Sequence, residues 1–211
     1  QDTDSLVSLG VLNRKYIPWS SSAMRPAAVR KIINDIIINE RKNVIEFGSG
    51  ISTIYIASIL KELGGGSFYS VEHDESWINI VLSILKKEGL ENYVNIIHAP
   101  LESSRFSINN LKWYSENCLM KILECPESID CVIIDGPMAY TKELSLSRYP
   151  ALPFLVENNM LSQNCIVILD DGQRWGEKRV IKRWEKTYDF SFKQMPMLNI
   201  AFSVRGKYFH S

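Results

Sequence analysis

Five short runs of β-branched and other apolar residues alternate along this chain with longer segments that have the spacing of amphipathic helices. The runs lie at residues 43–47, 67–72, 93–98, 130–135 and 165–170. Each run is almost continuously apolar, which is typical of strands buried on both faces of a parallel sheet. Parallel strands need a crossover connection, and the helical segments supply it. The alternation therefore predicts a doubly wound α/β sheet.

The segments around these strands are predicted to be helical. The predicted helices are residues 26–39, 52–63, 75–88, 111–124, 147–159 and 177–187. After the last helix the alternation stops, because two strand-like runs at residues 190–195 and 199–204 leave no room for a helix between them. Two such runs pair as an antiparallel hairpin. We therefore expect one seven-stranded sheet with five parallel strands and a C-terminal antiparallel hairpin.

Length and charge limit the possible functions. The 211 residues suit one large domain, which we place at residues 25–211 after an N-terminal extension at residues 1–24. Lysine and arginine total 24, as do aspartate and glutamate, so the formal net charge is +0. A nucleic-acid partner is not expected, because duplex binding needs a basic excess. A membrane partner is not expected either, since the apolar runs are far shorter than the roughly 20 residues of a membrane span.

Cysteine usage bears on the cellular compartment. The four cysteines are Cys118, Cys125, Cys131 and Cys165. No two of them have the spacing of a zinc site, and two lie within predicted strands, so we interpret them as buried reduced thiols. No basic-then-apolar signal segment is present in the sequence. These features predict a cytoplasmic protein, because reduced thiols persist in a reducing compartment.

The first predicted strand ends in the sequence Glu46-Phe47-Gly48-Ser49-Gly50, and a helix follows at once. The two glycines permit a sharp turn and let a ligand lie against bare backbone. Ser52 is predicted to cap the helix, which leaves N–H groups facing a ligand. Many tight turns contain such a glycine pair. Glu46 distinguishes this one, because dinucleotide-binding strands usually keep that position apolar, and a carboxylate there favours a cationic ligand.

The second predicted strand ends in acidic residues. Glu72 follows Gly50 by 22 positions, close to the roughly 20 that separate a glycine-rich turn from an acid that binds ribose hydroxyls. We assign that role to Glu72 because it belongs to the strand. Asp74 is the alternative ribose ligand, or the N-cap of the following helix. Trp77 either flanks an adenine ring or packs the helix onto the sheet.

Three aspartates close the fourth and fifth predicted strands: Asp135 ends the fourth, and Asp170 and Asp171 end the fifth. In an open α/β sheet these ends reach the same crevice as the glycine-rich turn. Converging carboxylates repel one another unless a cation or protons neutralise them, and Mg²⁺ prefers such oxygen ligands. In the alternative interpretation Asp135 contacts a cofactor or substrate, while Asp170 and Asp171 cap the next helix and bind no metal.

The Glu-x-Gly-x-Gly turn and the sheet with its terminal hairpin resemble class I S-adenosylmethionine-dependent methyltransferases, which have a Rossmann-like fold. The aspartates are similar to the ligands of metal-assisted O-methyltransferases of the catechol and macrolide-sugar type. The resemblance implies S-adenosylmethionine as cofactor, with Glu46 near its methionine portion, and Mg²⁺ on Asp135, Asp170 and Asp171. The cofactor contacts that it implies are Glu46, Gly48, Ser49, Gly50, Ser52, Glu72, His73, Ala99, Leu101 and Asp135.

The general base and the substrate contacts are less constrained. Catechol-type enzymes have a lysine close after the fourth-strand aspartate, but the first lysine here is Lys142. The candidate catalytic residues are Asp135, His98 and Lys142. His98 also suits a strand-end histidine bonded to backbone, and Lys142 suits a solvated surface lysine. Arg148 and Arg174 are candidate clamps for a carboxylate or phosphate of the substrate, or partners of nearby acids.

Together these residues favour an enzyme that transfers the sulfonium methyl group to a hydroxyl of a small molecule, either a sugar or a phenol, with help from Mg²⁺. Such an in-line displacement depends mainly on alignment of the reacting groups. The alternatives are a metal-independent N- or carboxyl methyltransferase, or a non-catalytic cofactor-binding module on the same scaffold. A nicotinamide dehydrogenase is disfavoured by Glu46 and by the terminal hairpin.

Overall fold

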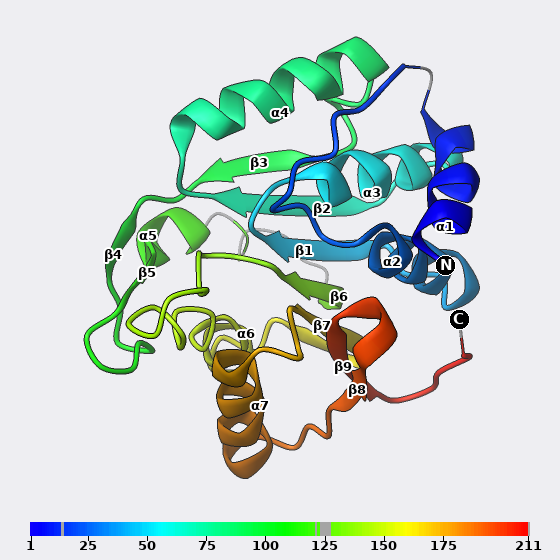
Figure 1. Cartoon of the computed structure of the whole chain (residues 1–211). Coiled ribbons are helices and arrows are strands. Elements are labelled where there is room, and N and C mark those ends of the chain that lie inside the picture. The colour runs from blue at the N-terminus through cyan, green and yellow to red at the C-terminus, as the bar shows by residue number, and fades with distance from the viewer. Residues whose placement is uncertain (14, 121, 123–127, 211) are drawn as a thin grey trace.

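A seven-stranded sheet runs through the centre of the computed structural model, in the order β3-β2-β1-β6-β7-β9-β8 (Figure 1). The strands are β1 Asn43–Phe47, β2 Ser67–Glu72, β3 Asn95–His98, β6 Ile129–Ile134, β7 Leu161–Asp170, β8 Lys193–Met195 and β9 Ile200–Arg205. Neighbouring strands from β3 to β7 are parallel, whereas β9 is antiparallel to both β7 and β8. The structure describes residues 1–13, 15–120, 122 and 128–210. The arrangement confirms the predicted fold class.

Helices cover both faces of the sheet, and Figure 1 shows α4 and α7 on opposite sides. One face carries α2 Pro26–Ile38, α3 Ile51–Glu62 and α4 Glu75–Glu88, and the other carries α5 Glu116–Leu119, α6 Ala151–Glu157 and α7 Trp175–Thr187. In β6, Cys131 and Ile133 pack into the core under α2 and α3, while Val132 and Ile134 pack into the core under α6 and α7. Successive strand side chains point to opposite faces, so two buried faces require the continuous apolar runs of the sequence.

The N-terminal residues pack against α2 and α3 through two short elements. These are α1 Asp2–Leu9 and η1 Gly10–Leu12. Leu9, Ile17 and Met24 are buried in the same core as α2 and α3. Arg25 Nη2 also donates to Asp2 Oδ2 at 2.6 Å. Apolar side chains from the predicted extension at residues 1–24 therefore contribute to the main core.

The prediction of a helix at residues 111–124 is wrong for the first residues of that range. The structure has a strand there, β5 Lys112–Tyr114, which pairs in antiparallel with β4 Leu101–Ser103. Trp113 and Tyr114 are fully buried, and burial of aromatic side chains on a pleated surface favours a strand. Of the residues described in this region, those of α5 form the α-helix. Residues 121 and 123–127 of the predicted helix lie outside the described residues.

The cysteines of the described residues are free thiols. Cys131 and Cys165 are buried, as predicted, and Cys118 is half-buried. Cys125 lies outside the described residues. Within the described part of the chain, no helix combines the length and the apolar character needed to cross a membrane.

Candidate active site

The carboxyl ends of β1, β2, β6 and β7 lie along one edge of the sheet. From β1 the chain continues to α3 on one face, and after β6 it continues to α6 on the other. The direction of winding therefore reverses between the neighbouring ends of β1 and β6, which we call the switch point. Ligands of open α/β sheets bind at such a position.

Two glycines in the turn after β1 have different surroundings. Gly48 has a φ of +97°, and a Cβ there would lie 2.8 Å from the backbone nitrogen of Gly136. Glycine therefore lets the turn approach the end of β6, where Asp135 N and Gly136 N donate to Phe47 O at 2.9 and 2.6 Å. Gly50 is extended, with a φ of −169°, and a Cβ there would meet no atom closer than 4.0 Å. Protein packing therefore does not require glycine at position 50, and the space beside it is open to a ligand.

Glu46 is completely buried and accepts three hydrogen bonds from hydroxyl groups. Ser52 Oγ and Thr53 Oγ1 each donate at 2.5 Å, and Ser70 Oγ donates at 2.7 Å. Burial raises the pKa of Glu46, and these hydrogen bonds oppose the shift. Glu46 therefore ties the first turn of α3 to β1 and β2.

Ser52 does not cap α3, so that prediction is wrong. The helix begins at Ile51, one residue earlier than predicted, with Gly50 as its N-cap. Gly50 N donates to Thr53 Oγ1 at 2.8 Å, while the Ser52 hydroxyl points back to Glu46. The role of Thr53 was not predictable from the sequence, because it follows from the position at which the helix begins.

Glu72 lies at the end of β2 and accepts three backbone hydrogen bonds. Its Oε1 accepts from His73 N at 2.7 Å and from Asp74 N at 3.0 Å, and its Oε2 accepts from Ser49 N at 3.2 Å. Burial would raise the pKa of Glu72, but hydrogen bonds from His73 and Asp74 outweigh that effect and lower it. Glu72 is therefore a charged carboxylate held beside the glycine-rich turn, as a ribose ligand needs to be.

Asp74 and Trp77 have clear structural roles. Asp74 is the N-cap of α4, and its Oδ1 accepts from Trp77 N at 3.1 Å. The structure therefore supports the capping alternative for Asp74. Trp77 Nε1 donates to Ser49 O at 2.8 Å, which joins the start of α4 to the glycine-rich turn.

The end of β3 lies away from the aspartates. His98 Nε2 lies 3.2 Å from His73 O, and β3 is separated from β6 by β2 and β1. The structure therefore does not bring His98 to Asp135, and it favours the backbone-bonded alternative. Ala99 is fully buried and donates its N–H to Glu72 O at 2.8 Å, and Leu101 is half-buried at the start of β4. Ala99 therefore lies next to the end of β2, while Leu101, the other predicted cofactor contact of this segment, pairs with Tyr114.

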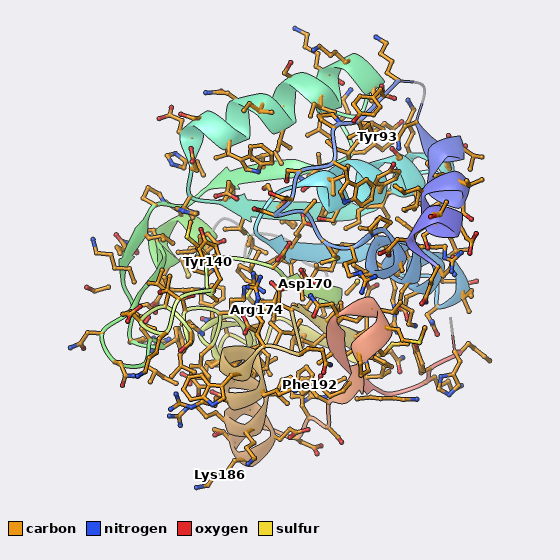
Figure 2. The ribbon with its side chains drawn as sticks, in the orientation of Figure 1. Tyr93, Tyr140, Asp170, Arg174, Lys186 and Phe192 are labelled. Atoms are coloured by element: carbon orange, nitrogen blue, oxygen red, sulfur yellow. The ribbon has the colours of Figure 1, made fainter. Side chains whose placement is uncertain are left out.

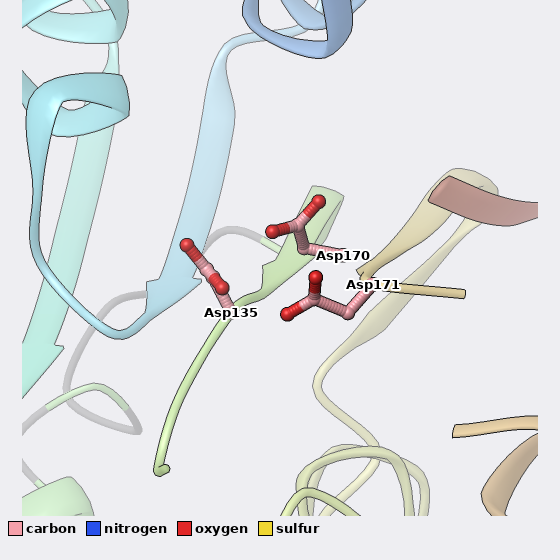
Figure 3. Close-up of side chains that lie close together, drawn as sticks. All are labelled: Asp135, Asp170 and Asp171. Carbon is pink, nitrogen blue, oxygen red and sulfur yellow. The ribbon is translucent and has the colours of Figure 1, made fainter. Parts of the chain in front are cut away.

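The three predicted metal ligands converge, and Figure 3 shows their carboxylates turned toward one space. One oxygen from each of Asp135, Asp170 and Asp171 lies within 4.8 Å of the others. Asp170 is 4% exposed, and its Oδ1 has no hydrogen-bond partner among the described residues. Asp171 has a φ of +56°, and its Oδ1 accepts from Asn199 Nδ2 at 2.9 Å. The structure thus places the three carboxylates together, as the strand ends predicted.

Arg148 is a partner of nearby acids, the second of its two predicted roles, and is not available to a substrate. It is buried, and its Nη2 donates to Asp135 Oδ1 at 3.1 Å while its Nη1 donates to Asp171 Oδ2 at 3.3 Å. Its remaining hydrogen bonds go to backbone oxygens of Pro137 and Asp170. Arg148 therefore joins the ends of β6 and β7 and neutralises part of their charge.

Arg174 and Lys142 are more exposed. Arg174 Nη1 lies 2.8 Å from Asp171 Oδ2, so this arginine is also an ion-pair partner. Figure 2 labels Arg174. Lys142 is exposed in the segment after β6. Among the described residues, no hydrogen bond or ion pair joins its side chain to the three aspartates, so the structure gives no support for Lys142 as a base.

Carboxyl groups outnumber arginines in this site. The carboxyl groups belong to Asp135, Asp170, Asp171 and Glu177, and the arginines are Arg148 and Arg174. Burial raises the pKa of Asp135 to about 6 and that of Glu177 to about 7. Burial and the neighbouring aspartates raise the pKa of Asp170 well above its ordinary value. The excess of acids therefore holds protons or attracts a cation.

Two residues of this site were missed by the sequence analysis. Glu177, in the first turn of α7, is 1% exposed, and its Oε1 lies 3.7 Å from Arg148 Nη1. Tyr114 is fully buried, and its hydroxyl lies against Gly136 at the switch point. Glu177 lies on a strongly amphipathic helix, and Tyr114 fell within a segment predicted to be helical, so neither position stood out.

The segment that contains these site residues matches a known protein family. A family model described as a methyltransferase domain matches residues 45–172, from β1 to the turn after β7. The chain belongs to this methyltransferase family. The match includes the glycine-rich turn, Glu72 and all three aspartates, and it confirms the predicted class I S-adenosylmethionine-dependent methyltransferase.

Solved structures share the fold of this methyltransferase. The Podospora anserina methyltransferase PaMTH1, bound to S-adenosylhomocysteine, has a TM-score of 0.69 at 15% identity and covers 97% of this chain and 88% of its own. An O-methyltransferase from Bacillus cereus in complex with S-adenosylhomocysteine has a TM-score of 0.60 at 16% identity, covering 97% and 90%. The O-methyltransferase TomG from Streptomyces achromogenes, in complex with S-adenosylmethionine, has a TM-score of 0.62 at 13% identity, also covering 97% and 90%. No curated protein matches this chain.

Proposed function

We propose that this methyltransferase transfers the methyl group of S-adenosylmethionine to a hydroxyl of a small molecule, with Mg²⁺ bound beside the acceptor. The observation that carries the proposal is the convergence of Asp135, Asp170 and Asp171 next to the glycine-rich turn. Two structural neighbours are described as O-methyltransferases, one bound to S-adenosylhomocysteine and one to S-adenosylmethionine, which supports the choice of oxygen.

The residues of the switch point suit S-adenosylmethionine. The space beside Gly50 accommodates a ligand against the backbone, and Glu72 supplies a charged, buried acceptor for ribose hydroxyls. Leu101, which is half-buried, offers an apolar side chain for a cofactor contact. The protein's contribution is to hold the sulfonium methyl in line with the acceptor oxygen and to keep water away.

The aspartates suit a divalent cation. Oδ1 of Asp170 is buried and has no hydrogen-bond partner within the part of the chain that the structure describes, and the two arginines leave an excess of acids. Asp135, Asp170 and Asp171 would hold Mg²⁺ through carboxylate oxygens, the ligands that it prefers. A bound Mg²⁺ orients an acceptor hydroxyl and lowers its pKa. Asp135 and Lys142 stay candidates for the group that accepts the hydroxyl proton.

The test is methyl transfer from labelled S-adenosylmethionine to a panel of phenols, sugars, amines and carboxylic acids, in Mg²⁺ and in excess EDTA. We expect labelled methyl ethers, loss of turnover in EDTA, and recovery when Mg²⁺ is restored. Methylated amines or esters formed equally well in EDTA would instead support the metal-independent alternative. Failure of the protein to bind S-adenosylhomocysteine would support the non-catalytic alternative.

A further inference from the structure

Tyr114 ends β5 with its ring packed among aromatic side chains. Its ring centroid lies 5.9 Å from that of Phe47, 5.7 Å from that of Trp113 and 6.1 Å from that of His73. The whole side chain is buried. A phenylalanine would make the same ring contacts, so packing explains the ring and leaves the hydroxyl unexplained.

The hydroxyl of Tyr114 lies at the switch point. A Cβ at Gly136 would collide with it, and the same Cβ would lie 2.8 Å from Gly48 Cα. Glycine at position 136 therefore lets the phenol oxygen reach the place where the turn after β1 meets the end of β6. This is the turn against which the methionine portion of the cofactor is expected to lie.

This hydroxyl has no hydrogen-bond partner among the described residues. Leaving a buried polar group unpaired is unfavourable, and almost all such groups in folded proteins are paired. Burial, together with the nearby carboxyl groups of Glu72 and Asp135, raises the pKa of Tyr114 well above its ordinary value of 10. The phenol therefore keeps its proton and can donate it in a hydrogen bond.

We propose that Tyr114 is a cofactor-binding residue whose hydroxyl donates a hydrogen bond to the carboxylate of the methionine portion of S-adenosylmethionine. The assignment rests on the cofactor of the proposed function. The carboxylate is the strongest acceptor of that portion, and the surrounding acids Glu46, Glu72 and Asp135 cannot donate to it when they are ionised. Tyr114 supplies a neutral side-chain donor at this position.

The test compares Tyr114→Phe with Tyr93→Phe by titration calorimetry and thermal unfolding. Tyr93 lies just before β3, far from the labelled site residues (Figure 2), and serves as the control. The probes are S-adenosylhomocysteine and 5′-methylthioadenosine, which lacks the amino-acid portion. Because hydrogen bonds to charged groups contribute roughly 1.5–3 kcal/mol, we expect Tyr114→Phe to lose about tenfold or more in affinity for S-adenosylhomocysteine and none for 5′-methylthioadenosine. Its melting temperature should equal or exceed that of the wild type, because an unpaired hydroxyl is removed.

Each other outcome overturns the assignment in a distinguishable way. Unchanged affinity for both probes would make Tyr114 a packing residue only. Equal losses for both probes would place the hydroxyl against the nucleoside and refute the contact with the carboxylate. A wild-type protein that binds neither probe would refute the proposed cofactor use itself, and the assignment with it.

Discussion

Gly48 and Gly50 are two positions apart, yet the protein needs only one of them for its own packing. Gly48 has a positive φ and touches the backbone of Gly136, whereas a side chain at Gly50 would point into free space. The fold therefore requires glycine at position 48, whereas glycine at position 50 leaves room for a ligand. Similar contrasts between neighbours separate structural from functional residues elsewhere in the site.

Substitution of Gly50 should reduce ligand affinity, whereas substitution of Gly48 should reduce stability. We expect Gly50→Val to unfold at nearly the wild-type temperature but to lose at least about tenfold in affinity for S-adenosylhomocysteine, because its side chain occupies ligand space. Gly48→Ala should lose about 2 kcal/mol or more of stability through backbone strain and collision. Calorimetric titration and urea unfolding measure both effects. Wild-type affinity in a folded Gly50→Val protein would contradict the ligand position.

Glu72 and Asp74 form a second such pair. Glu72→Ala should weaken binding of S-adenosylhomocysteine by at least about tenfold, because the ribose hydroxyls lose a charged acceptor. Asp74→Ala should keep the affinity and lose about 1 kcal/mol of stability, because α4 loses its N-cap. A reversal of these two results would show that Asp74 binds the ribose.

At the scale of elements, strands that are buried on both faces were predictable, and their ends located most of the site. β1 and β2 have the predicted bounds. β5 was not predictable, since its strand conformation depends on burial of Trp113 and Tyr114 against other elements. The ion pairs of Arg148 were not predictable for the same reason: they join segments that are distant in the sequence.

The proposed Mg²⁺ site at the ends of β6 and β7 can be tested by its effect on protein stability. Mg²⁺ that binds only the folded protein should raise its unfolding temperature, with a gain of about 2.7 kcal/mol at a concentration 100-fold above the dissociation constant. Asp170→Asn should abolish this gain and leave the affinity for S-adenosylhomocysteine unchanged. Asp130→Asn is the matched control, because Asp130 is on the same strand pair but accepts hydrogen bonds from Lys42 N and Asn43 N at the opposite edge. A wild-type protein that gains nothing from Mg²⁺ would refute the metal site.

At the scale of the whole molecule, acidic and basic residues are equal in number, but acidic residues are in excess at one site. The formal net charge is +0, yet four carboxyl groups share two arginines at the ends of β6 and β7. This excess makes the free energy of unfolding depend on pH. The pKa values of Asp135 and Glu177 are raised in the folded protein, so folding takes up protons there.

Stability without metal should therefore fall as the pH rises from 5 to 8. The contribution of Glu177 is complete below its unfolded pKa of 4.5 and is lost as the pH passes its folded pKa of about 7. The loss is on the order of 3 kcal/mol at full ionisation. Glu177→Gln should flatten the decline, and Mg²⁺ should stabilise the wild type more at pH 8 than at pH 5. Urea unfolding across this range measures both, and a stability that rises with pH in both proteins would contradict the raised pKa values.

The position of β9 also sets the order in which the two halves of the site can form during protein synthesis. The glycine-rich turn and Glu72 come from neighbouring segments, so this part of the cofactor site leaves the ribosome well before β7 and β9 do. Asp171 accepts a hydrogen bond from Asn199, and β9 covers the open edge of β7. Until those residues emerge, a nascent chain exposes the unpaired backbone N–H and C=O groups along the edge of β7, the kind of surface to which chaperones and other unfinished chains bind.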